Sequence, residues 1–245
     1  MGTRNLTMLI MDNKPRIAQY GQWDGNPSGQ GITVLKFLQR LEKYPTVKKS
    51  FMAKLKRVKF IDAEKQKEID IWLESIGVKN GWLNMEQANL YHMKYPLLTR
   101  DHGANILPLV YDQKGRDTIW LHDSSDFVTD GLFNEWTYVI DLDKRVLEVY
   151  HGFAKTMPPK DNRFYNQIVE SEAKEKEELL TWDRRQIELN EKGLTPEQIE
   201  KAIGRRPYVR DEPYYIELMH TFNIDELPTQ EEFLAILEPN EEENE

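Results

Sequence analysis

The chain contains no cysteine, and its 245 residues carry more acidic than basic side chains. The absence of cysteine excludes disulfide bonds, thiolate nucleophiles and thiolate metal ligands, and it is typical of a reducing compartment. No run of apolar residues is long enough to span a bilayer, and the N-terminal residues lack the order of a secretory signal. The sequence therefore predicts a cytoplasmic protein that does not bind membranes.

Standard catalytic and nucleotide-binding motifs are also lacking. The chain has no Walker A sequence, no dinucleotide-binding glycine pattern and no HExxH pair, and Ser124 and Ser125 have no nucleophile-elbow context. The net charge of −9 disfavours contact with polyphosphates, although a local basic patch could override that effect. We therefore expect no cofactor, no metal and no general nucleic-acid binding, and the sequence favours a non-enzymatic protein over an enzyme.

Short apolar segments separated by polar turns indicate strands. Residues 5–10 and 16–22 are expected to pair as a hairpin around a turn with Asn13 and Pro15. The further strand-like segments are residues 105–111, 118–122, 135–142 and 145–150. The last two of these predict the clearest hairpin. We expect an α+β fold in which a mostly antiparallel sheet, built from hairpins, packs against helices.

Helices are expected where apolar residues recur at helical spacing and a capping residue precedes them. The first expected helix comprises residues 31–43. A second expected helix follows it and has an apolar face that extends to Val58. The expected capping residues are Asp62, Asn84 with Gln87, Thr195 and Thr229 with Glu232.

The distribution of charge divides the chain into three parts. Residues 1–160 are expected to form the α+β core domain, and residues 161–206 a charged helical hairpin arm. Residues 207–245 are expected to be a C-terminal helical segment, of which the acidic tail 241–245 is predicted to be disordered. The arm either binds a partner, including a second copy of the chain, or packs along the core.

A glycine-rich loop precedes the first helix and is the first candidate site. Gly25, Gly29 and Gly31 permit a close approach of backbone to an anion, and the start of the following helix offers N–H donors. Trp23 is suited to stacking on a base or sugar, and Asp24 to accepting hydrogen bonds from a ligand hydroxyl. The alternative is a tight strand-to-helix connection with Trp23 in the core.

Two other groups of polar residues are weighed beside this loop. Lys56, Arg57 and Lys59, on the basic stretch 48–59, offer a phosphate-binding face if that stretch folds next to the glycine loop, or else a solvated helix face. The predicted element ends carry Arg100, Asp101, His102, His122, Asp123, Asp126 and His151. A histidine paired with an aspartate can act as a general base, although ion pairs and helix caps use the same residues.

The residues above resemble a family of bacteriophage and microbial proteins that open with Met-Gly/Ser-Thr-Arg and carry a Trp-Asp-Gly-Tyr-Pro-type loop. The matching residues are Gly2-Thr3-Arg4 and Trp23-Asp24-Gly25-Asn26-Pro27, with Asn26 in place of the usual aromatic residue. Residues 100–103 and the segment from 138 to 150 also resemble the family, so that the likeness covers residues 2–152. The resemblance implies a phage-type protein and brings no activity with it.

A looser likeness of topology links the N-terminal strand and hairpin to N-terminal-nucleophile hydrolases. In such enzymes a freed terminal Ser, Thr or Cys attacks an amide bond. Removal of Met1 would expose Gly2, which has no nucleophile, and Thr3 would require a further cut.

These observations lead to three functional hypotheses. The first is a phage accessory protein that binds a small anionic ligand, such as a nucleotide, or a host protein, with a role against host defence; its ligand-binding residues would be Arg4, Trp23, Asp24, Gly25, Gly29, Gly31, Arg100, Asp101 and His102. The second is a hydrolase of amide or phosphoester bonds that uses Thr3, Asp24, His102 or His122. The third is a protein-binding module that uses the helical arm.

Overall fold

The computed structural model describes residues 2–79, 81–207 and 212–238. Its centre is a sheet of five strands in the order β2-β1-β5-β6-β7. The bounds of these strands are β1 Asn5–Met11, β2 Lys14–Gly21, β5 Trp136–Asp141, β6 Val146–Ala154 and β7 Tyr215–Asn223. All neighbours pair antiparallel except β1 and β5, which run parallel. The predicted α+β class with a mostly antiparallel sheet is therefore confirmed.

Both predicted hairpins are present in this sheet. Asp12 and Asn13 turn the chain between β1 and β2 with φ of 58° and 57°, values that Asn and Asp tolerate better than most residues. Their N–H groups donate to the Asp143 carboxylate in the β5–β6 turn, at 3.0 and 2.7 Å. The two hairpin turns therefore lie side by side at one end of the sheet.

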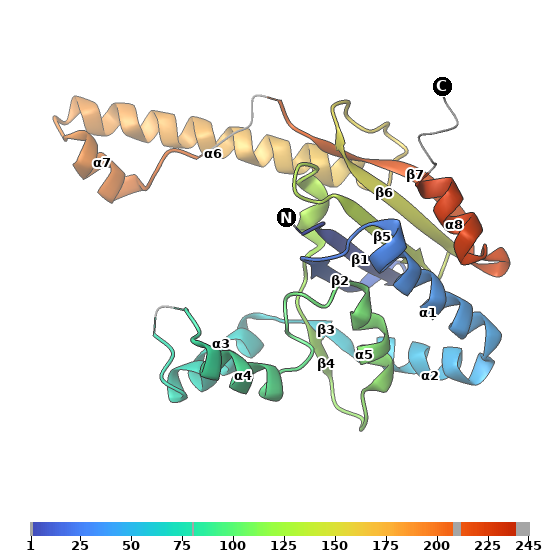
Figure 1. The fold of residues 1–245 in the computed structure, drawn as a ribbon. Coiled ribbons are helices and arrows are strands. Elements are labelled where there is room, and N and C mark those ends of the chain that lie inside the picture. The colour runs from blue at the N-terminus through green and yellow to red at the C-terminus, as the bar shows by residue number, and fades with distance from the viewer. Residues whose placement is uncertain (1, 80, 208–211, 239–245) are drawn as a thin grey trace.

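Helices cover both faces of the sheet, as Figure 1 shows. On one face lie the π-helical turn η1 Pro27–Gly31, which leads into α1 Ile32–Lys43, then α2 Pro45–Leu55, α5 Ile106–Asp112 and α8 Gln230–Leu237. The other face is covered by η3 Ser125–Thr129 and the first turns of α6 Tyr165–Glu191. Alternating strand residues, such as Leu9 and Ile140 toward α1 and Leu6 and Val139 toward α6, fill two separate apolar cores.

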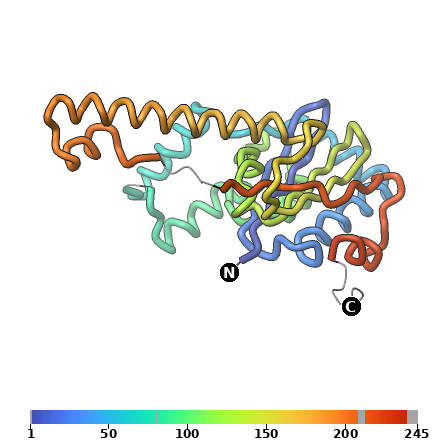
Figure 2. Tube along the Cα trace, turned by 90° about the horizontal axis from the view of Figure 1, so that it is seen from above, coloured from blue at the N-terminus to red at the C-terminus, as the bar shows by residue number. Residues whose placement is uncertain are grey.

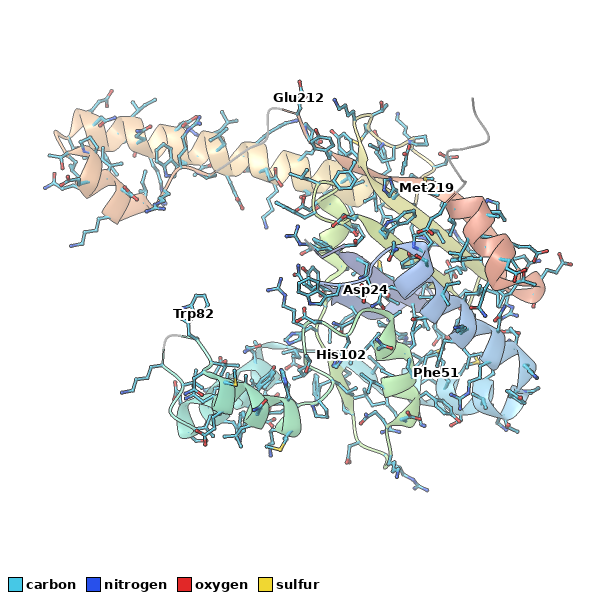
Figure 3. The ribbon with its side chains drawn as sticks, viewed as in Figure 1. Asp24, Phe51, Trp82, His102, Glu212 and Met219 are labelled. Carbon is cyan, nitrogen blue, oxygen red and sulfur yellow. The ribbon has the colours of Figure 1, made fainter. Side chains whose placement is uncertain are left out.

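Two helical hairpins extend from this body (Figures 1 and 2). One consists of α6 with α7 Pro196–Ile203, and the indole Nε1–H of Trp182 donates to the Gly204 carbonyl at 3.1 Å across it. It is the predicted charged arm. The other consists of α3 Ala63–Ser75 and α4 Met85–Lys94, whose Trp72, Tyr91 and Tyr95 rings pack together. Figure 3 shows Trp82 exposed at its tip.

The predicted capping residues all cap helices. Asp62 accepts the Lys65 N–H at 2.8 Å, and Asn84 with Gln87 completes a capping box. Thr195 with Gln198 and Thr229 with Glu232 form two more. These local signals held because a cap involves only residues three apart.

Three parts of the sequence prediction were wrong. Residues 105–111 form the 3-10 turn η2 Gly103–Asn105 and helix α5, because Ile106, Leu107 and Val110 bury one helical face and Pro108 is tolerated in a first turn. Val58 begins a strand, β3 Val58–Phe60, which pairs parallel with β4 Ile119–Leu121.

The third error concerns the C-terminal segment, which was expected to be helical. It contains the edge strand β7 and the 3-10 turn η4 Ile224–Glu226 before α8. The middle of β7 is largely exposed, so that its residues show little apolar alternation. The predicted acidic tail, residues 241–245, lies outside the described residues.

Candidate functional site

The glycine loop folds back on the first strand instead of opening around a cavity. The Gly25 N–H donates to the Thr3 carbonyl at 2.9 Å, and the Gln30 N–H donates to the Asp24 carbonyl at 2.8 Å. The N–H groups of Gly29 and Gly31 both donate to the Asn26 carbonyl. These N–H groups, which the sequence analysis considered as donors to an anion, are therefore bonded to backbone carbonyls of the loop and of Thr3.

Other parts of the protein pack closely against each of these three glycines. A Cβ on Gly25 would lie 2.7 Å from the Thr3 oxygen, and one on Gly29 would lie 2.2 Å from the Asp24 oxygen. Gly31 is close to Tyr138, whose hydroxyl donates to the Gly25 carbonyl at 2.8 Å. The loop thus has the geometry of a tight strand-to-helix connection, which is the alternative reading of its sequence.

The side chains of Trp23, Arg4 and Asp24 have different surroundings. The Trp23 side chain is 57% exposed, and its ring lies against the Gly2 backbone. The Arg4 guanidinium stacks on the Phe133 ring, with 4.6 Å between its carbon and the ring centre. Asp24 is exposed and has a φ of 55°. Trp23 is therefore a surface ring, and the alternative that places it in the core is wrong on this point.

The segment Arg100–Gly103 lies beside the loop, as expected for residues of one site. The Gln30 side chain joins the two segments, since its Oε1 accepts the Ala104 N–H at 2.7 Å and its Nε2 donates to the Trp23 carbonyl at 3.3 Å. His102 itself donates from Nε2 to the Pro96 carbonyl at 2.7 Å, a bond that stabilises the turn.

A cleft of about 460 Å³ opens on the outer side of β2, next to this segment. Its lining comes from β2, from residue 100, from the end of β4 and from η3. The lining residues are Gln19, Tyr20, Arg100, His122, Asp123, Ser124 and Phe127. Its size is within the range of small-molecule sites in proteins. Of the nine predicted ligand-binding residues, Arg100 is the one that lines this cleft.

Aromatic rings and one guanidinium form the main wall of the cleft. The Arg100 guanidinium stacks on the Tyr20 ring at 4.8 Å, and the Phe127 ring packs edge-on against the same ring at 5.0 Å. The Gln19 side chain donates to the carbonyls of Tyr20 and Arg100, at 2.8 and 3.0 Å, and thereby fixes the backbone beneath Arg100. The Arg100 side chain remains 72% exposed, so that its N–H groups are accessible to a ligand.

His122 also lines the cleft. Burial lowers the pKa of its imidazole, and a hydrogen bond with the backbone of Leu98 offsets part of that effect. The ring is therefore neutral near pH 7, when it can accept or donate a proton. Asp123, by contrast, caps the following turn, since its carboxylate accepts the Ser125 N–H at 2.9 Å.

The remaining predicted polar residues do not gather into a catalytic or metal-binding cluster. His151 packs on the Trp136 ring at 4.6 Å, and burial lowers the pKa of its imidazole. Asp101 is exposed, with its carboxylate 3.9 Å from the Arg100 guanidinium. Within residues 2–79, 81–207 and 212–238, no three His, Cys, Asp or Glu side chains are placed to share a metal ion.

Sequence reasoning missed Gln19, Tyr20 and Phe127 as site residues. Tyr20 lies between buried residues of β2, and an aromatic residue at such a position is common in strands and does not indicate a binding site. Phe127 is more than a hundred residues away in the chain, and its approach to Tyr20 depends on the bridge between Ala18 and Asp123. No local motif marks these residues.

Comparisons of the chain with models of protein families, with curated proteins and with solved structures find no match. The predicted resemblance to the phage family therefore stays a prediction. No helix in the described part of the chain is long and apolar enough to cross a membrane.

Proposed function

We propose that the protein binds a small anionic ligand of the nucleotide class in the cleft beside β2. The observation that supports this most is the stacking of the exposed Arg100 guanidinium on Tyr20 at the mouth of the cleft. A guanidinium presents several N–H donors in a plane that matches phosphate oxygens. The aromatic wall of Tyr20 and Phe127 suits the flat base of the same ligand.

The His122 imidazole is expected to become protonated when an anionic ligand binds. An anion in the cleft favours the imidazolium form, so that ligand binding raises the pKa of His122 toward its ordinary value. The affinity is then coupled to proton uptake. The roles in infection, host-protein binding and defence that the sequence suggests stay predictions beside this proposal.

Isothermal titration calorimetry with nucleoside mono-, di- and triphosphates tests the proposal, with inorganic phosphate as the minimal anion. We expect Arg100→Ala to weaken binding about tenfold or more, because it removes a charge-assisted contact. The matched control is Arg4→Ala, which removes an arginine that stacks on Phe133 outside this cleft. Absence of binding across the panel, or an equal loss in both variants, would overturn the proposal.

The position of His122 in the cleft supports the second hypothesis, in which the protein is a hydrolase. A half-buried, neutral imidazole that lines a cleft can accept a proton from water. Chromatography of the ligand after long incubation distinguishes the two functions. Unchanged ligand supports binding alone, whereas turnover that His122→Gln abolishes supports hydrolysis.

A further inference from the structure

The segment from Lys36 to Lys59 carries charge opposite to that of the rest of the chain. It contains nine lysine and arginine residues and a single carboxylate, Glu42, in a protein of net charge −9. Glu42 is paired with Arg145 at 2.8 Å and with Lys48 at 2.9 Å, so that it is neutralised locally. The segment comprises most of α1, all of α2 and part of β3.

Two cations of this segment lie against one tyrosine of α5, Tyr111. The Arg40 guanidinium from α1 lies 5.0 Å from the centre of the Tyr111 ring, and the Lys54 ammonium from α2 lies 4.6 Å from it. Lys54 also donates to the Tyr111 carbonyl. Lys36 is exposed and lies one helical turn before Arg40, on the same side of α1.

The loop after α5 adds further cations to this surface. The Arg57 guanidinium donates to the carbonyls of Gly115 and Asp117, at 3.1 and 2.9 Å, and thereby holds the loop against α2. Lys114 and Arg116 are exposed on this loop. The surface made of Lys36, Arg40, Lys54, Arg57, Tyr111, Lys114 and Arg116 is called the Tyr111 patch below. The carboxylates of Asp112 and Asp117 are also exposed at its edge.

The Tyr111 patch shares no residue with the glycine loop or with the lining of the cleft. The glycine loop precedes α1, whereas Arg40 is in the last turn of α1, about 12 Å further along the axis at 1.5 Å per residue. In the basic stretch 48–59, Lys54 lies against Tyr111 and Arg57 binds the loop 115–117, so these two cations are engaged by α5 and its loop and not by the glycine loop. The function of the patch is independent of the function proposed for the cleft.

We propose that the Tyr111 patch binds the phosphodiester backbone of a nucleic acid. Its cations are spread over two helices and a loop, which is more surface than a single small anion contacts. Repeated Lys and Arg contacts with phosphates release counterions and give affinity without sequence specificity. The Tyr44 ring, which is exposed next to Lys43 at the end of α1, provides a stacking surface for an unpaired base. The acidic remainder of the protein confines the nucleic acid to this side.

Fluorescence anisotropy with a labelled oligonucleotide of about 20 nucleotides tests this proposal. Single-stranded DNA, its duplex and an RNA of the same sequence are compared at about 50 and about 200 mM salt. The test variant is Lys36→Glu with Lys114→Glu, since both side chains are exposed and neither takes part in a bond that supports the fold described above. The control is Lys192→Glu with Lys201→Glu, which changes the net charge equally on the helical arm.

We expect the wild-type protein to bind with a dissociation constant below about 100 µM at the lower salt, and the affinity to fall steeply at the higher salt. The patch variant is expected to bind at least tenfold more weakly. The slope of the logarithm of the binding constant against the logarithm of the salt concentration should become shallower by about 0.7 to 0.9 for each lost phosphate contact. The neutral variant Lys36→Gln with Lys114→Gln should lie between them, and it replaces the charge-reversal variant if circular dichroism shows that the latter is unfolded.

Three results would overturn the proposal. The first is no binding of any oligonucleotide at the lower salt. The second is an equal loss in the patch and control variants, which would attribute the effect to net charge alone. The third is tighter binding of polyglutamate than of every oligonucleotide, which would assign the patch to an acidic protein.

Discussion

The glycine loop and the cleft beside β2 lie next to each other, and they differ in how much the local sequence reveals of them. The loop is conspicuous in the sequence, yet its glycines serve contacts with Thr3, Asp24 and Tyr138. The cleft is built from ordinary residues of distant segments, yet it has an exposed guanidinium, an aromatic wall and a half-buried histidine. A run of glycines indicates close packing, but it does not say whether the close neighbour is a ligand or the protein itself.

The strongest test of this comparison is Gly25→Ala in the loop. The added Cβ would lie 2.7 and 2.8 Å from the backbone oxygens of Thr3 and Arg4, neither of which can rotate away. We expect a loss of about 2 to 3 kcal/mol in the free energy of unfolding, measured by urea denaturation. Ser28→Ala, at an exposed position of the same loop, should change it by less than about 0.5 kcal/mol. A Gly25→Ala protein that is stable but binds the ligand poorly would indicate that the glycine loop, and not the cleft, is the ligand site.

Tyr138→Phe removes the hydroxyl that ties the loop to the sheet. The Tyr138 hydroxyl is buried and donates to the Gly25 carbonyl at 2.8 Å. Its removal leaves that carbonyl without this donor and should cost about 1 to 2 kcal/mol of stability in the same assay. The affinity of the cleft for its ligand should stay unchanged, and a clear change would show that the two regions act together.

Gln19→Ala tests whether the backbone beneath Arg100 must be held in place for the ligand to bind. The Gln19 amide holds the carbonyl of Arg100 at 3.0 Å, so that its loss frees the backbone that positions the guanidinium. We expect ligand affinity, measured by calorimetry, to fall about fivefold, which corresponds to roughly 1 kcal/mol. Leu109→Ala, which shortens a partly buried side chain outside the cleft, provides the comparison. Equal effects of both variants on affinity would argue against a positioning role for Gln19.

The pH dependence should have opposite signs for stability and for binding. Burial lowers the pKa of both His122 and His151, so that the unfolded chain takes up protons more readily than the folded protein below about pH 6.5. The contribution of these two histidines to stability should therefore fall as the pH drops through that value and level off below their folded pKa values. The affinity for the anion should instead rise over the same range. A His122→Gln protein whose affinity still rises on acidification would contradict this role of His122.

The smallest effect is expected for Trp23→Ala. More than half of the Trp23 side chain is exposed, and its contact is with the Gly2 backbone. We expect less than about 0.5 kcal/mol of change in stability and no change in ligand affinity. A marked loss of affinity would return the ligand site to the glycine loop and away from the cleft.

The helix caps show which features a sequence predicts well. Thr195 and Thr229 each cap a helix because the donor lies three residues further along the chain. Residues 105–111 show the opposite, since their apolar and β-branched composition suits a strand and a buried helix equally. Strand β7 could not be foreseen because an edge strand that is mostly exposed has no clear alternation.

The α+β class, both hairpins of the sheet, the caps and the charged helical arm could be predicted from the sequence, because each depends on residues close together in the chain. The tertiary structure alone decided which polar residues meet. Arg100 stacks on Tyr20, eighty residues earlier, and Arg40 and Lys54 meet on Tyr111 because α1, α2 and α5 pack on one face of the sheet. Contacts of this range follow from the burial of two apolar cores, and no local pattern encodes them.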